Sequence, residues 1–176
     1  MKWKPKSPEY EVQYSPSEYD LYRNNDPSSK YADVRWPLLR GRGRHGEFPL
    51  IVVREHFRNK GYSVLASEPE LPNLEGFLLV SYPGKRRNNH PAFIQMERFF
   101  DRDIIEELNT VADQQKIDKT GNAGGGDPDL FVFNDQETFF VEVKHNDQLN
   151  KNQLITFPLI EKYCNTEILI ARLVER

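Results

Sequence analysis

Cysteine is nearly absent from this chain of 176 residues, because Cys164 is its only one. A single cysteine excludes an internal disulfide framework, so we expect a reduced thiol on a half-buried helix end. Long apolar runs are also lacking, and none approaches the roughly 20 residues that a membrane-spanning helix needs. No apolar segment follows the basic first residues, which argues against a secretory leader. We therefore expect a cytoplasmic, intracellular protein.

The length is that of one domain with a single core. Residues 1–44 are rich in Pro, Ser and Asn and include five tyrosines, which predicts an irregular, basic and tyrosine-rich arm without a core of its own. Its aromatic side chains either stack on unpaired bases or pack onto the domain, and the second arrangement is the more common. Residues 45–176 form the folded domain, with a helical insertion around residues 91–118.

Helical spacing of apolar residues predicts a helix from Phe48 to Lys60, with Pro49 in its first turn and Gly61 at its C-terminal cap. The insertion is predicted to be one long helix or two short ones. Its expected core positions are Ile94, Phe99, Ile104, Ile105, Leu108 and Val111. Strands are expected over residues 62–66, 77–80 and 167–174.

The most informative segment begins at Gly126-Asp127-Pro128-Asp129-Leu130 and continues through Phe140-Val141-Glu142-Val143-Lys144. Residues 130–133 and 138–143 are apolar and rich in β-branched and aromatic side chains around a turn, so they predict a hairpin. Strand alternation places Phe140, Glu142 and Lys144 on one side. The other side carries Phe139, Val141 and Val143, which we expect to be core.

Two acidic groups close together need a positive counterpart. If Asp129 and Glu142 lie about 4 Å apart, their repulsion is on the order of 4 kcal/mol at an effective dielectric constant of about 20. Lys144 supplies one charge, whereas Mg²⁺ or Mn²⁺ would supply two and bind a phosphate oxygen as well. Such an ion would polarise a phosphate and acidify a bound water, while Lys144 would orient the water or stabilise the transition state.

With the following Asn146-Asp147-Gln148-Leu149-Asn150-Lys151-Asn152-Gln153, these strings resemble the VRR-NUC nuclease module of the PD-(D/E)xK superfamily. The similarity covers roughly residues 120–176, with a weaker one near 45–65. The resemblance implies a restriction-endonuclease-like core of order αβββαβ, with a mixed central sheet flanked by helices. It also implies a divalent cation and DNA cleavage, in some members at branched structures.

The resemblance assigns roles to particular residues. Asp129, Glu142 and Lys144 take the signature positions, and Gln153 falls where the family places a glutamine on the next helix. The family also carries a glutamate on its first helix, for which Glu47 is our choice and Glu55 the alternative. The candidate catalytic residues are therefore Asp129, Glu142, Lys144, Gln153 and Glu47, and the candidate metal ligands are Asp129, Glu142, Val143 and Glu47.

The chain departs from the family pattern at Pro158, which lies inside the stretch that the resemblance assigns to a helix. An interior proline costs on the order of 3 kcal/mol, so we expect this helix to kink or stop near Phe157. Asp127 and Asp129 also form an Asp-x-Asp pair, as in metal-dependent sugar transferases, but that motif needs neither Glu142 nor Lys144. The four histidines are too scattered to indicate a zinc site.

The formal net charge of −3 is unfavourable for a DNA-binding protein, since affinity for a polyanion depends on lysines and arginines. The positive charges are clustered, however, just before Glu47 and again at residues 85–87. Either the two clusters hold phosphates on both sides of a cut, or they are solvated loops. The candidate nucleic-acid-binding residues are Arg40, Arg42, Arg44, Lys85, Arg86 and Arg87.

Ordinary structural explanations exist for each residue taken alone. Asp129 is typical of a proline-containing turn, and Glu142 with Lys144 could form an ion pair worth about 0 to 1 kcal/mol on a solvated face. Their combined order favours a Mg²⁺- or Mn²⁺-dependent DNA nuclease. The alternatives are a catalytically inactive nucleic-acid-binding or assembly module and a restriction-type enzyme acting with a partner. A homodimer would suit junction cleavage, and the sequence leaves endonuclease and exonuclease action, and DNA and RNA, undistinguished.

Overall fold

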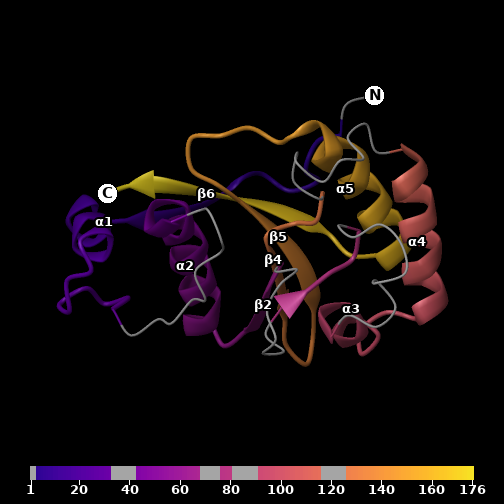
Figure 1. Cartoon of the computed structure of the whole chain (residues 1–176), viewed down its shortest axis with the longest axis horizontal. Coiled ribbons are helices and arrows are strands. Elements are labelled where there is room, and N and C mark those ends of the chain that lie inside the picture. The colour runs from indigo at the N-terminus through magenta and orange to yellow at the C-terminus, as the bar shows by residue number, and fades with distance from the viewer. Residues whose placement is uncertain (1–2, 33–42, 68–75, 81–90, 116–125) are drawn as a thin grey trace.

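The computed structural model describes residues 3–32, 43–67, 76–80, 91–115 and 126–176, leaving out the side chains of 43–46. These residues form a mixed six-stranded sheet with strand order β1-β6-β5-β4-β2-β3. Helices cover both faces of the sheet (Figure 1). The expected α/β class is therefore confirmed. None of the helices in the described ranges is long and apolar enough to cross a membrane.

Strand direction changes across the sheet. β1, β6 and β5 are parallel to one another, β4 is antiparallel to both β5 and β2, and β3 is parallel to β2. In chain order the elements are β1 (Tyr10–Tyr14), α1 (Pro16–Arg23), α2 (Gly43–Asn59), β2 (Ser63–Ser67), β3 (Gly76–Phe77), α3 (Pro91–Met96), α4 (Arg102–Gln115), β4 (Leu130–Phe133), β5 (Thr138–Lys144), α5 (Lys151–Cys164) and β6 (Ile168–Glu175).

The predicted hairpin is confirmed by the antiparallel pairing of β4 with β5, and the predicted last strand by β6 beside β5. Only one side of β5 was expected to be core, and this is wrong. Val141 is fully buried against α2, and Phe140 is equally buried on the opposite side, against α5. β5 is a central strand covered on both faces. Its register is fixed because a shift of one residue would exchange the side chains buried on the two faces.

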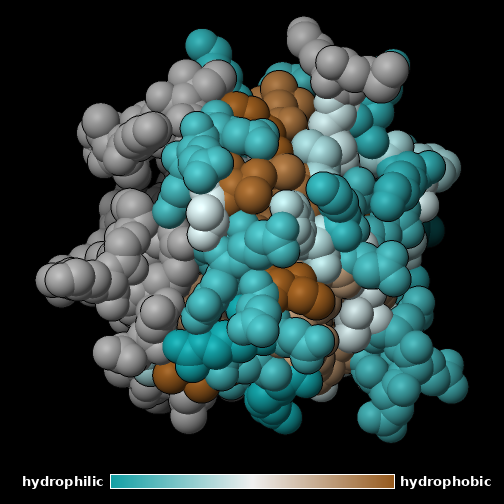
Figure 2. Space-filling model, turned by 90° about the vertical axis from the view of Figure 1, so that its right-hand side faces the viewer, coloured by the Kyte–Doolittle hydropathy of each residue, from teal (hydrophilic) through white to brown (hydrophobic). Residues whose placement is uncertain are grey.

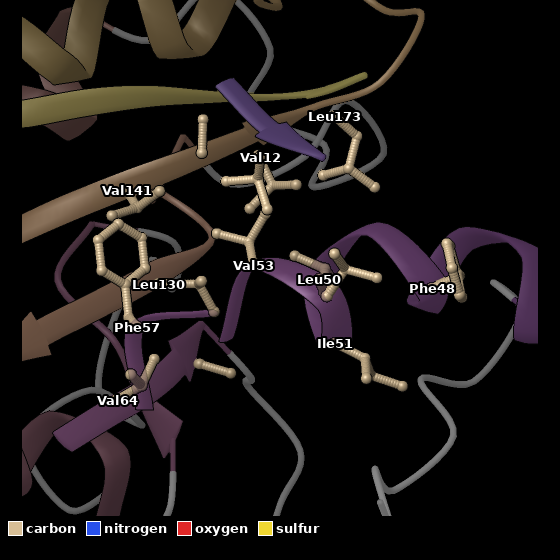
Figure 3. Close-up of a cluster of buried hydrophobic side chains, with 14 of the residues drawn as sticks. Val12, Phe48, Leu50, Ile51, Val53, Phe57, Val64, Leu130, Val141 and Leu173 are labelled. Atoms are coloured by element: carbon tan, nitrogen blue, oxygen red, sulfur yellow. The ribbon is translucent and has the colours of Figure 1, made fainter. Parts of the chain in front are cut away.

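Helix α2 packs its apolar side on the sheet. Val53 and Phe57 point toward Val12, Leu130 and Val141 (Figure 3). The helix begins five residues earlier than predicted, so Pro49 lies in its interior and not in its first turn. Gly61 follows the helix with φ of +90°, a left-handed conformation that favours glycine, as the predicted cap requires.

The prediction of an irregular N-terminal arm without a core is wrong for the part that the structure describes. β1 joins the sheet as its edge strand beside β6, and α1 packs against α2. Four of the arm's five tyrosines surround Phe48, which is fully buried with aromatic ring centroids 4.9 to 5.8 Å away. They therefore take the packing role. The rings in contact with Phe48 belong to Tyr14, Tyr19, Tyr22 and Tyr31.

The insertion forms two helices, α3 and α4, which cover the opposite face together with α5 (Figure 1). Ile105 and Leu108 are fully buried as expected, whereas Ile94 is 47% exposed and is not a core residue. β3 is shorter than the predicted 77–80, because the N–H groups of Leu79 and Val80 bond to the Asp127 side chain.

Helix α5 runs through Pro158 to Cys164, so of the two predicted outcomes, a kink or a stop near Phe157, the stop does not occur. Phe157 and Ile160 are fully buried against the sheet, and this packing offsets the cost of the interior proline. The helix ends at Cys164, a buried free thiol, and Asn165 follows in the left-handed conformation. Its uninterrupted first turns matter because they carry Gln153.

Candidate functional site

The candidate site lies where β4 begins and β5 ends. Leu130 pairs with Val141 in the antiparallel ladder, so one step further Asp129 stands opposite Glu142. Asp129 is anchored from both neighbouring strands: its carbonyl accepts the N–H of Ser67 at 2.7 Å, and its Oδ2 accepts the N–H of Val143 at 2.9 Å. The two predicted carboxylates therefore converge at one end of the sheet.

Glu142 is a nearly fully buried carboxylate, with 1% of its surface exposed. Its Oε1 accepts hydrogen bonds from Lys144 Nζ at 2.8 Å and from Gln153 Nε2 at 2.6 Å. Its Oε2 is buried and has no hydrogen-bond partner within the described residues. Burial, and next the charge of Asp129, raise the pKa of Glu142 well above its usual value, against the opposing effects of Lys144 and Gln153.

Lys144 bridges two acids. Its buried ammonium contacts Glu142 Oε1 at 2.8 Å and Asp147 Oδ2 at 2.9 Å. Burial acts to lower the pKa of Lys144, but Glu142 and Asp147 outweigh burial and leave the pKa above its usual value. Asp147 was not singled out from the sequence, because its position depends on the bend of the chain after β5.

Gln153, a predicted catalytic residue, also has a structural role that was not predicted. It closes a capping box at the start of α5, in which its Oε1 accepts the N–H of Asn150 at 3.0 Å while Asn150 Oδ1 accepts the N–H of Gln153 at 2.8 Å. Because Oε1 accepts from the backbone, Nε2 faces Glu142 and donates to it. The Asn-x-x-Gln spacing is typical of a capping box, so this cap could have been predicted from the sequence although it was not.

Gly126 and Asp127, which precede Asp129 in the chain, attach the site to neighbouring parts of the fold. Gly126 has φ of +90°, and a Cβ at this position would lie 2.8 Å from Thr156 Oγ1 on α5. Asp127 Oδ1 accepts the N–H groups of Leu79 and Val80 at 3.1 and 2.9 Å. Its position explains the Asp-x-Asp spacing, since Asp127 secures a backbone turn while Asp129 reaches the site.

The structure does not complete a three-carboxylate centre. Glu47 is fully buried on α2, which packs on the sheet face opposite to Glu142 and α5. Glu55, the alternative, lies further along α2 and pairs with Arg58 at 3.4 Å. Throughout the described ranges, no three His, Cys, Asp or Glu residues come close enough to hold a metal ion. Asp129 and Glu142 are thus the acidic pair of the site.

Five of the six predicted phosphate-binding residues lie outside the part of the chain that the structure describes. Arg40, Arg42, Lys85, Arg86 and Arg87 lie outside the described residues, and Arg44 belongs to α2 without a described side chain.

Comparison with protein-family models, with curated proteins and with solved structures finds no match of any of these three kinds.

Proposed function

We propose that this protein is a divalent-metal-dependent nuclease that hydrolyses DNA phosphodiester bonds. One observation carries the proposal: Asp129, Glu142, Lys144 and Gln153 meet at one end of the sheet, and a buried carboxylate oxygen of Glu142 lacks a hydrogen-bond partner within the described residues. A buried acceptor left unsatisfied is costly in a purely structural ion pair. A cation at that oxygen would remove the cost.

The order of elements supports a restriction-endonuclease-like core. Along the chain α2, β2, β4, β5, α5 and β6 follow the αβββαβ order that the VRR-NUC resemblance implies. In this assignment β1, α1, β3, α3 and α4 are additions to the core. Similar order alone does not specify function, so the proposal rests on the site.

The donor set suits Mg²⁺ or Mn²⁺. Mg²⁺ in proteins commonly keeps several waters and uses one or two carboxylates together with substrate phosphates. Asp129 and Glu142 would supply the carboxylates, and Val143 could supply only its backbone carbonyl. In this proposal Glu47 is not a ligand, consistent with its place on the helix of the other face.

The bound cation would polarise the scissile phosphate and acidify the attacking water. Lys144 would hold a proton at Nζ and stabilise negative charge that develops on the phosphate oxygens. Gln153 positions the Glu142 carboxylate through Nε2, and its own orientation is fixed by the helix cap. Asp147 retains the Lys144 ammonium at the site when Glu142 Oε1 turns to another partner.

A catalytically inactive nucleic-acid-binding module is the second candidate. The contact between Lys144 and Glu142 favours it, because the lysine already supplies a positive charge to the carboxylate that a metal would use. In the nuclease, a cation at Glu142 Oε2 and the phosphate of the substrate would compete with this ion pair for Glu142 and Lys144. In the inactive module the pair stays closed.

Fluorescent duplex, flap, splayed-arm and four-way-junction DNAs distinguish the two candidates. Each DNA is incubated with Mg²⁺ or Mn²⁺ and either the natural protein or Lys144→Ala. The nuclease predicts cleavage that falls by a factor of about 10² or more in the variant. Binding without cleavage under both metals would identify the inactive module. Sizing the products separates endonuclease from exonuclease action, and measuring the mass in solution tests the predicted homodimer.

A further inference from the structure

We propose that Arg172 is a further phosphate-binding residue of this site and that Glu9, from the segment before β1, occupies its guanidinium in the absence of nucleic acid. The inference rests on the proposed nuclease function and adds Arg172, beside Lys144, as a second positively charged side chain that contacts the substrate. It assigns a role to two residues that the sequence did not single out.

Arg172 stands next to Lys144 on the same face of the sheet. The two are register partners on the parallel strands β5 and β6, which places their backbones about 4.8 Å apart. Earlier partners in the same ladder, Phe140 with Ile168 and Glu142 with Ile170, all face the α5 side. Arg172 therefore continues the row of side chains that contains Glu142 and Lys144.

Glu9 binds Arg172 in the geometry that a phosphate would use. Arg172 Nε donates to Glu9 Oε2 at 2.5 Å, and Nη2 donates to Oε1 at 2.9 Å. This two-bond fork is the arrangement in which guanidinium groups recognise carboxylates and phosphates alike. The Arg172 side chain is 30% exposed and that of Glu9 is 45% exposed, so a phosphate can approach from solvent.

A purely structural role explains the pair poorly. Exposed ion pairs add little to stability, and β6 is already held between β1 and β5. The segment that carries Glu9 is secured on its own by Ser7, which donates to Glu167, and by Trp3, whose Nε1 donates to Glu161 at 3.1 Å. Glu9 can therefore release Arg172 without detaching the segment.

Asp147 connects Arg172 with the rest of the site. It bonds Lys144 directly and also acts electrostatically on Arg172. Lys144 and Arg172 thus share one acidic neighbour. A DNA strand that places one phosphate at Lys144 brings the adjoining part of its backbone toward Arg172. Recognition of this kind is independent of base sequence.

The test measures binding of a fluorescein-labelled splayed-arm DNA by fluorescence anisotropy in EDTA, apart from any cleavage. Arg172→Ala should bind about tenfold more weakly, because hydrogen bonds to charged groups are among the strong ones. The slope of log affinity against log salt concentration should fall by about one in magnitude. Glu9→Gln should bind roughly two- to fivefold more tightly, in line with the small strength of an exposed ion pair.

A matched pair controls for net charge. Arg102 and Glu106 form an exposed ion pair at 2.9 Å on α4, away from the site. Arg102→Ala changes the net charge as Arg172→Ala does, and Glu106→Gln changes it as Glu9→Gln does. Both control variants should leave the affinity for DNA within about twofold of the natural protein. Arg172→Lys keeps the charge but loses the fork, so it should restore the salt slope with only part of the affinity.

The outcomes separate the inference from the function on which it rests. If Arg172→Ala behaves like Arg102→Ala while the natural protein still binds or cleaves DNA, Arg172 has no such role and the nuclease proposal stands. Weaker binding by Glu9→Gln would overturn the occupation of Arg172 by Glu9. If the natural protein neither binds nor cleaves any of the DNAs, both proposals fail together.

Discussion

The two faces of the central sheet bury different kinds of side chain. The face under α2 is filled with aliphatic residues and with the aromatic cluster around Phe48. The face under α5 is also buried: Phe131 and Phe140 on the sheet and Phe157 on α5 are fully enclosed. At the end of β5, however, that second face carries Glu142 and Lys144, which are buried together with Gln153 of α5.

The difference separates stability from chemistry within one layer of strands. Apolar burial stabilises each enclosed side chain by about 1.5 to 3 kcal/mol, whereas a buried ion pair often contributes nothing net. A polar cluster on a central strand therefore requires either a structural or a functional reason. Neighbouring residues on β5 face opposite ways, so the same strand contributes side chains to the core under α2 and to the candidate site.

Truncation of Phe48 should have the largest effect on stability. Phe48→Ala removes a fully buried ring with aromatic neighbours, and we expect a loss of about 3 to 5 kcal/mol in the free energy of unfolding. Urea denaturation followed by circular dichroism measures it. Ile94→Ala, at a 47% exposed position, serves as control and should cost less than about 1 kcal/mol. Similar losses for the two variants would refute the aromatic cluster as the centre of this face.

Removal of the Lys144 charge should destabilise in a way that depends on pH. The pKa of Glu142 in the folded protein is raised above 4.5, so above pH 4.5 the folded state keeps a proton that the unfolded state releases. Its stability contribution therefore falls as pH rises toward the folded pKa. Lys144→Met removes the positive charge that acts to lower the pKa of Glu142. The variant should lose about 3 kcal/mol near pH 8 and less at pH 5.

The double variant Glu142→Gln with Lys144→Met provides the control. It removes both charges, so the additional dependence on pH should disappear. Unfolding free energies at pH 5 and pH 8 for the natural protein and both variants decide the point. An equal loss at the two pH values in Lys144→Met would show that Glu142 does not titrate as the buried carboxyl described here.

Gln153→Glu isolates the contact between α5 and the site. A glutamate at this position keeps the capping box but replaces the donor to Glu142 with a second negative charge. We expect a loss of about 1.5 to 3 kcal/mol in stability near pH 8. Gln148→Glu, at an exposed position just before α5, controls for the added charge. Unchanged stability in Gln153→Glu would show that the bond to Glu142 carries no energy.

Two glycines with the same backbone conformation have different surroundings. Gly61 and Gly126 both have φ of +90°, but only Gly126 faces Thr156 of α5, and Gly61 has open space. Gly61→Ala should cost about 1 kcal/mol from the backbone conformation alone. Gly126→Ala should cost more, because α5 must shift as well. Thermal unfolding of both variants measures the difference, and equal costs would show that α5 does not approach this turn closely.

The sequence predicted the elements whose signals are local. The β-branched and aromatic composition identified β5, and the order of Asp129, Glu142, Lys144 and Gln153 predicted residues that the structure brings together. The N-terminal strand escaped prediction because its partner β6 lies some 160 residues further along the chain. Pro49 was expected in a first turn and Pro158 at a kink or a stop, but both lie inside helices whose tertiary packing outweighs the cost of an interior proline.

Other features of the site depend on geometry that no local pattern encodes. Glu47 has the right residue type but belongs to the helix of the opposite face. Asp147 and Arg172 become neighbours of Lys144 only through the bend after β5 and the register of β6. Such contacts follow from the assembled sheet and not from spacing along the chain.

Electron paramagnetic resonance of Mn²⁺ with the purified protein measures whether Asp129 and Glu142 together bind a divalent cation. We expect one bound ion per chain in the natural protein, and loss of that ion in Asp129→Asn and in Glu142→Gln. Glu106→Gln, remote from the site, should bind as the natural protein does. Mn²⁺ binding that survives in both Asp129→Asn and Glu142→Gln, or no binding by the natural protein at all, would contradict the proposed metal site.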